Sequence, residues 1–332
     1  MKKKFVLTLA LVLMVAASLM AAPVELKGSF KAGYKFTFEN PIKIAGAFND
    51  GSNQVVIDAL SVSTDFWKVS ISDAGSFFKD TTGNITLYLD KALAEEGVDM
   101  GDVSLSVVLG NKSTMDALSV YSDPDGTYDL AAGKLQMTGA LSTGVTIGHA
   151  KLGSAYIAFD PLNASRNLLA SVKVTPVDGI SATFGWAKKT AASVDGAING
   201  SVKVDVAALA DLDMALTASA IALYDLDDKN VELLAAANTE IEGIGLWAEY
   251  TNLTKKNGLG VGASYDVNDK LSVSGSFRAT DLAAIKTTYS VSASASYGLF
   301  GGATYDLGLG YAYDTTAAKG LFSMTPTVKV TF

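Results

Sequence analysis

Alternation of apolar and polar side chains with a period of two is the feature that most restricts the fold. In residues 24–38 the even positions read Val, Leu, Gly, Phe, Ala, Tyr, Phe and Phe, whereas the odd positions read Glu, Lys, Ser, Lys, Gly, Lys and Thr. Successive side chains of a strand point to opposite faces, while a helix would scatter both sets around its circumference. The stretch therefore predicts a strand with one apolar and one polar face.

The pattern recurs along the chain, mostly in segments of about 8 to 13 residues, close to the length with which a tilted strand crosses a bilayer. Turn sequences such as Pro176-Val-Asp-Gly179 separate the segments. Candidate strands are 24–38, 42–48, 54–72 (one strand or two), 84–90, 103–109, 116–122, 127–141, 144–159, 167–175, 180–187, 197–206, 213–224, 231–238, 243–251, 258–266, 270–279, 286–297, 303–313 and 320–332. No Pro-rich linker or composition break divides them.

The first 22 residues have the three parts of a secretory signal peptide. Three lysines at 2–4 precede an apolar run from Phe5 to Val15, and small residues fill most of 16–22. The apolar run is too short for a membrane-spanning helix. We expect cleavage near Ala21 or Ala22, and a single domain over residues 23–332.

Composition argues against an enzyme. The chain has no Cys, a single His at 149, and Arg only at 166 and 278, whereas catalytic sites draw heavily on these residues. His149 shares a face with Val145 and Ile147, so a structural role is favoured. We expect no catalytic, metal or cofactor site. Without the three lysines of the signal peptide, 23 of the 26 basic residues remain against 34 acidic ones, a formal net charge of −11 that disfavours nucleic acid as a partner.

The C-terminus carries the most specific signal. Val328, Val330 and Phe332 fall on one face of the last segment, and the chain stops on the aromatic ring. This terminus resembles the closing strand of bacterial outer-membrane β-barrels, in which alternating apolar residues and a terminal Phe act as an assembly signal. Met324 fits the same face, whereas Pro326 departs from the pattern. In size and layout the chain resembles the porin-like members.

Three further features favour a membrane barrel over a soluble sandwich. Aromatic residues such as Trp247 and Tyr250 gather at segment ends, where we expect them to form the girdles at the lipid–water interfaces. The polar faces are rich in small residues, as in Ser290-Val-Ser-Ala-Ser-Ala-Ser296. Backbone groups in hydrocarbon must all be paired, so a sheet there must close on itself. Segments 24–38 and 320–332 are the natural closing partners. We therefore predict an all-β fold, a closed antiparallel transmembrane barrel of about 18 strands (16 to 20), because bacterial barrels have even strand numbers.

Two groups of charged residues are candidates for the lining of a pore. The resemblance to porins implies an early loop that folds into the lumen, and we identify it with residues 91–102, which carry Glu95, Glu96, Asp99 and Asp102. A solvated surface loop is the alternative. The second group is expected on one lumen wall by strand parity, with simple charge balance as the alternative: Lys27, Lys31, Lys35, Lys43 and Lys329.

The resemblance implies a protein of the cell outer membrane. The expected function is a porin-like channel for passive diffusion of small hydrophilic solutes, with a weak preference for cations from the acidic loop. The expected partners are outer-membrane lipid, the barrel-assembly machinery, and other copies of the chain in a homo-oligomer such as a trimer. Two alternatives remain open: a structural or adhesin-type surface barrel with a closed lumen, and a secreted soluble all-β binding protein.

Overall fold

The structure is a computed structural model that describes residues 24–48, 51–72, 82–110, 114–122, 124, 138–161, 167–188, 196–314 and 318–332. The expected signal peptide, residues 1–22, lies outside the described residues. In the part of the chain that the structure describes, no helix is both long and apolar enough to cross a membrane.

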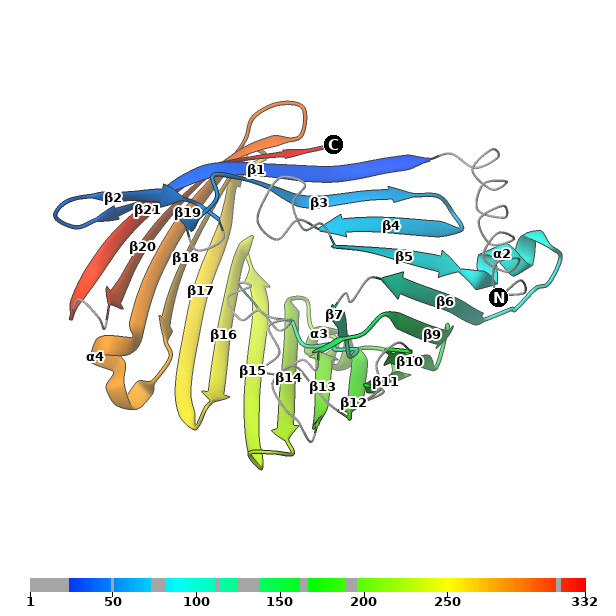
Figure 1. Ribbon diagram of the computed structural model, residues 1–332. Coiled ribbons are helices and arrows are strands. Elements are labelled where there is room, and N and C mark those ends of the chain that lie inside the picture. The colour runs from blue at the N-terminus through cyan, green and yellow to red at the C-terminus, as the bar shows by residue number, and fades with distance from the viewer. Residues whose placement is uncertain are drawn as a thin grey trace.

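Eighteen antiparallel strands close into one barrel (Figure 1). Each strand pairs with its neighbours in chain order, and the last strand returns to pair with the first. The all-β closed barrel of 18 strands predicted from the sequence is confirmed. The wall strands are β1 (Glu25–Phe38), β3 (Val55–Ser63), β4 (Trp67–Ser72), β5 (Thr82–Tyr88), β6 (Val103–Gly110), β9 (Thr143–His149), β10 (Gly153–Phe159), β11 (Leu168–Val177), β12 (Ile180–Ala187), β13 (Ala197–Asp205), β14 (Ala215–Asp225), β15 (Asn230–Ile241), β16 (Ile244–Leu253), β17 (Lys256–Asn268), β18 (Leu271–Ala279), β19 (Tyr289–Gly298), β20 (Ala303–Asp314) and β21 (Lys319–Thr331).

Three short strands lie outside this count. β2 (Lys43–Gly46) pairs with the far part of β1, while β3 pairs with the near part of the same edge. Together β2 and β3 act as one wall strand that is interrupted by residues 47–54. β7 (Thr114–Asp116) and β8 (Thr138–Ala140) form a separate two-stranded sheet.

The helices of the described residues lie in connections at the two ends of the barrel. α2 (Leu89–Glu95) and α3 (Val206–Ala210) lie at the end where both β1 begins and β21 finishes, here called the terminus end. The 3-10 helix η3 (Leu282–Ala284) and α4 (Ile285–Thr288) lie at the opposite end. The Asp205 carboxylate accepts a hydrogen bond from the Ala208 N–H (3.0 Å), which caps α3 at the point where β13 stops.

Two-residue turns join two consecutive hairpins of the second half. Glu242 and Gly243 connect β15 to β16, and Thr254 and Lys255 connect β16 to β17; all four have positive φ angles between 50° and 79°. Turns with two residues in this region match the right-handed twist of the flanking strands. The eleven strands predicted from residue 167 onward are therefore all present, with short connections as expected.

The first half differs from the sequence-based prediction in two places. Segment 144–159 is two strands, because Gly153 takes a φ of 115° and the chain turns back after His149. Neither residues 116–122 nor the described residues of the predicted segment 127–141 form a wall strand. The described part of the second, Thr138–Ala140, forms β8, and residues 117–122 are extended but pair with no strand.

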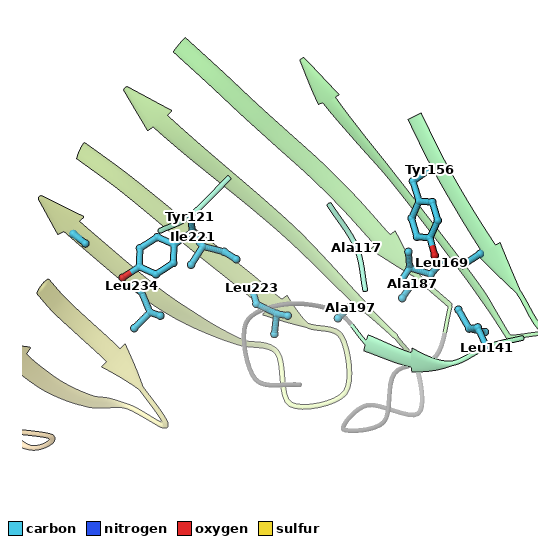
Figure 2. Packing of buried hydrophobic residues seen from close by; sticks show 12 residues of the cluster. Ala117, Tyr121, Leu141, Tyr156, Leu169, Ala187, Ala197, Ile221, Leu223 and Leu234 are labelled. Carbon is cyan, nitrogen blue, oxygen red and sulfur yellow. The ribbon is translucent and has the colours of Figure 1, made fainter. Parts of the chain in front are cut away.

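Register divides the wall into two faces, because residues directly across from each other point to the same side. The residues of one face can be followed from strand to strand, because each is either directly across from the one before it or two positions along the same strand. They are Ser201, Ile221, Ser219, Ala236, Glu249, Gly260, Arg278, Ser290, Ala312, Leu321, Ser323 and Thr37. This is the inner face, since residues 117–122 contact it from inside the ring (Figure 2).

The outer face is apolar and exposed. Phe184, Val202, Leu259 and Val261 are between 38% and 55% exposed, although none of them is polar. Aromatic rings mark both ends of this band. Phe322 of β21 and Phe332, directly after that strand, are ten residues apart. At about 3.3 Å per residue and a tilt of about 40°, this separation spans about 25 Å, the height of the apolar band of a membrane barrel.

Candidate functional site

The inner segment, residues 117–122, crosses the inside of the barrel along the wall of β11–β14. It is held by a serine ladder in which every second backbone N–H of the segment donates to a wall hydroxyl. Leu118 N–H donates to Ser171 Oγ (3.0 Å), Val120 N–H to Ser201 Oγ (2.9 Å) and Ser122 N–H to Ser219 Oγ (3.4 Å). The period-two pattern of the segment thus reflects an extended chain that bonds to side chains, and not to a neighbouring strand.

Apolar packing reinforces the serine ladder. Figure 2 shows Ala117 and Tyr121 of the inner segment beside side chains that the wall strands direct inward. The buried cluster comprises Ala117, Tyr121, Leu141, Tyr156, Ala158, Leu169, Ala187, Ala197, Ile221, Leu223, Leu234 and Ala236. Each member is at most 8% exposed. One side of the lumen is therefore filled by a compact apolar core.

A buried ion pair fixes the end of the inner segment. The Tyr121 hydroxyl donates to Glu249 Oε1, and Arg278 Nη1 donates to Glu249 Oε2 at 2.5 Å. Glu249 is 1% exposed and Arg278 is 5% exposed. Charge is tolerated at such burial only when it is paired and hydrogen-bonded, and both conditions hold here.

Trp247 completes this group from β16. The Arg278 guanidinium lies 4.9 Å from the centroid of the indole ring, a cation–π distance. Space for the ring comes from two glycines of β17: a Cβ added at Gly260 would lie 2.9 Å from the ring of Trp247, and Gly262 faces the same ring. Sequence reasoning grouped Trp247 with the lipid-facing aromatics, and that assignment is wrong because its strand position faces inward.

The inner face of β18 and β19 is exposed to solvent over much of its length. On β18 and β19, Ser274 Oγ and Ser294 Oγ lie 2.7 Å apart, and Ser276 Oγ and Ser292 Oγ lie 2.6 Å apart. Ser274, Ser292 and Ser294 are exposed although they occupy inner-face positions. These serines therefore line open space in the lumen, whereas Arg278 near the end of β18 reaches the inner segment through Glu249 and Tyr121.

The lysines singled out from the sequence share this inner face. Lys31 of β1 lies directly across the barrel seam from Lys329 of β21, and Lys27 and Lys35 occupy the same face of β1. Lys43 lies across from Thr37 on that face. Nearby carboxylates balance part of the charge: Lys27 pairs with Glu25 at 2.7 Å, and Lys43 pairs with Glu39 at 2.9 Å.

The predicted pore loop, residues 91–102, here called the acidic connection, joins β5 to β6 and is separate from the inner segment. Glu95 ends α2, and Glu96, Asp99 and Asp102 follow it in the turn between β5 and β6 at the terminus end. All four are exposed, and α2 packs mainly on β6. The Asp99 carboxylate accepts from the Gly101 N–H at 2.8 Å within the turn. The residues that contact the inner wall are instead 117–122.

The C-terminal residues form one side of the seam. Val330 lies across from Phe30, and Val328 lies across from Ala32. Phe332 exchanges two backbone hydrogen bonds with Gly28 (2.9 and 3.0 Å), and its ring stacks on Phe30 with centroids 5.6 Å apart. The predicted pairing of the first and last segments is confirmed. The ladder is interrupted between Gly33–Thr327 and Phe36–Met324, next to Pro326, which has no N–H to donate.

His149 occupies the outer face at the end of β9, where its Nδ1 accepts from the Lys151 N–H at 3.2 Å. This bond closes the turn to β10, in keeping with a structural role. Within the described residues, no group of three His, Asp or Glu side chains is arranged to hold a metal ion.

Comparisons with known proteins agree with this architecture. No protein-family model matches the chain, and no curated protein is similar to it. Among solved structures, three engineered variants of the porin of Rh. blastica are similar, with TM-scores of 0.53, 0.52 and 0.53. Each is 10% identical, and each alignment covers 93% of this chain and 100% of the porin. The fold is that of a porin barrel. At this identity the likeness concerns the fold alone.

Sequence reasoning missed the serine ladder and the Glu249–Arg278 pair. A signal was present for the pair: Arg278 is one of two arginines in the chain, and it follows Ser272, Ser274 and Ser276 at polar-face positions of β18. An arginine on the inner face of a barrel predicts an acidic partner there.

Proposed function

We propose that the protein is a channel of the outer membrane through which small hydrophilic solutes diffuse passively, with no catalytic step and no cofactor. One observation carries the proposal. The inner segment is fastened to the wall of β11–β14, and the opposite wall keeps exposed serines and lysines on its inner face. An 18-stranded barrel is wide enough to leave an aqueous passage between the two.

The outer face supports the proposed location. Its exposed apolar band, bounded by aromatic rings, suits outer-membrane lipid as the surrounding medium. A soluble all-β binding protein would have little reason to expose such a band around a closed barrel. We propose removal of residues 1–22 on export, insertion by the barrel-assembly machinery through Val328, Val330 and Phe332, and a homotrimer as the assembled form.

The proposed ion selectivity of the channel follows from the positions of its acidic and basic side chains. The carboxylates of Glu95, Glu96, Asp99 and Asp102 lie at the terminus end, and we assign them to the channel entrance, where their field would enrich small cations. The lysines along β1 and β21 would oppose that preference inside. The net result proposed here is a weak preference for cations.

Liposome swelling tests the proposed passage. Liposomes that contain the folded protein should swell in neutral sugars, at rates that fall as the sugar grows larger. Liposomes carrying the heat-denatured protein provide the control. A protein that is folded and inserted but gives no swelling with the smallest sugar would favour a structural surface barrel with a closed lumen.

A further inference from the structure

A hollow of about 530 Å³ lies between the inner segment and the wall of β11–β14, on the terminus side of the serine ladder. Its volume is within the range of about 300–1,000 Å³ that is typical of sites for small molecules. The polar side chains that the argument uses are Ser119, Lys173, Thr175, Ser181, Lys203 and Thr217. Register places the wall members of this set on the inner face, so they converge on the hollow.

Two lysines line the end of the hollow that is next to the serine ladder. Lys173 stands on β11 and Lys203 on β13; they are two strands and two residues apart, so their Cα atoms are about 12 Å apart. Both side chains are half-buried. Among the described residues, neither forms an ion pair with a carboxylate. The two ammonium groups are therefore available to a ligand that enters between them.

The acidic residues of the hollow, Asp178 and Asp205, lie toward the terminus end. Asp205 uses one carboxylate oxygen to cap α3, and Asp178 is exposed in the turn between β11 and β12. These two charges do not neutralise the lysines by contact, but they would repel an extended polyanion at the entrance. Hydroxyl groups of Ser119, Ser181 and Thr217 add donors and acceptors around the space between.

We propose that this hollow is a binding site for a small organic anion with one or two carboxylate or phosphate groups and a body that accepts hydrogen bonds. Lys173 and Lys203 bind the anionic groups, and the hydroxyls bind the rest. This inference rests on the proposed function and names a class of solute that binds inside the channel during its passage.

The test uses calorimetric titration of the detergent-folded protein with succinate and, separately, with inorganic phosphate. Saturable binding of succinate is expected, and the Lys173→Gln/Lys203→Gln variant should weaken it at least about tenfold, since two charge-assisted contacts are lost. The matched control is Lys31→Gln/Lys329→Gln, which removes two inner-face charges elsewhere and should leave the affinity within about twofold. Lys173→Arg/Lys203→Arg should retain binding and shows that the site still folds.

Three outcomes would overturn the site: no binding of either probe, equal weakening in both glutamine variants, or retained binding in the Lys173→Gln/Lys203→Gln variant. Phosphate binding without succinate binding would replace the organic anion by a phosphate site and so overturn the proposed ligand class. Since binding is measured without conduction, the two proposals separate. A protein that binds succinate but forms no channel would refute the channel alone, whereas a conducting protein that binds neither probe would refute the site alone.

Discussion

Arg278 and Glu249 show how a charged pair can be held inside the barrel. The carboxylate accepts from both Tyr121 and Arg278, and the guanidinium also lies over Trp247. The two charges satisfy each other, and the indole ring shields them from water. The pair thus joins the wall of β16–β18 to the inner segment.

Replacing Arg278 with Ala should destabilise the barrel by about 3–5 kcal/mol, because the Glu249 carboxylate would remain buried without its cation. The midpoint of urea unfolding, followed by tryptophan fluorescence, measures the loss. Arg278→Lys is the control; it keeps the charge but not the planar contact with Trp247, so its loss should be smaller. An unchanged midpoint for Arg278→Ala would show that the pair contributes nothing to stability.

Single residues were predictable wherever strand alternation decided their face. Lys31 and Lys329 were placed on one wall by parity, and the register sets them directly across the seam. Trp247 was misassigned because its nearness to a strand end was given more weight than its parity with Glu249. Which strand a residue contacts across the lumen was beyond prediction, since Tyr121 and Glu249 are 128 positions apart and neither carries a local signal for the other.

Among the elements, residues 91–102 were predicted to fold into the lumen, whereas the segment that contacts the inner wall in the structure is 117–122. The sequence-based prediction has 144–159 as one strand and 116–122 and 127–141 as two more. Counted along the chain from the C-terminus, this number of strands places residues 91–102 at the barrel end opposite the termini. The actual division, with β9 and β10 joined by a turn, puts that connection at the terminus end and leaves residues 111–142 as the long connection. Alternation identifies an extended chain but does not say whether it bonds to strands or to side chains.

The serine ladder gives a prediction for the inner segment as a unit. Each backbone-to-hydroxyl bond contributes about 1 kcal/mol, so Ser171→Ala/Ser201→Ala/Ser219→Ala should loosen the segment. Because the chain has no Cys, Ser119→Cys provides a single labelling site. Its reaction with a maleimide should be at least about ten times faster in the triple variant.

The matched control for that experiment removes hydroxyls from the opposite wall. Ser274→Ala/Ser292→Ala/Ser294→Ala takes away the same number of inner-face hydroxyls without touching the inner segment. Its labelling rate at position 119 should equal that of the parent. Equal rates in all three proteins would mean that the apolar cluster alone holds the segment.

For the molecule as a whole, closure depends on the seam between β1 and β21. Removing Phe332 takes away two backbone hydrogen bonds to Gly28 and the ring that stacks on Phe30, about 3 kcal/mol together. The folded fraction, read as the heat-modifiable band on a gel, should fall several-fold, while barrels that do fold should conduct as before. Phe332→Tyr keeps the ring and should assemble normally. Full assembly without residue 332 would refute its role as an assembly signal.

Most of the barrel could be predicted from the sequence, because its wall is built from hairpins whose two strands and turn are close together in the sequence. Each hairpin of the second half carries its own alternation and its own turn, such as Glu242-Gly243, and closure follows once strands are amphipathic and numerous. The interior depends on contacts between distant strands. The apolar cluster around Leu169, Ile221 and Leu234 therefore became apparent only when the wall was assembled.

An open aqueous lumen with Lys31, Lys35 and Lys329 on its wall can be tested by single-channel recording in a planar bilayer under a KCl gradient. The parent protein should give stepwise, ohmic openings, and Lys31→Glu/Lys35→Glu should give openings whose reversal potential is shifted toward that of potassium. A folded protein that gives no openings, or a reversal potential that the two substitutions leave unchanged, would contradict the account.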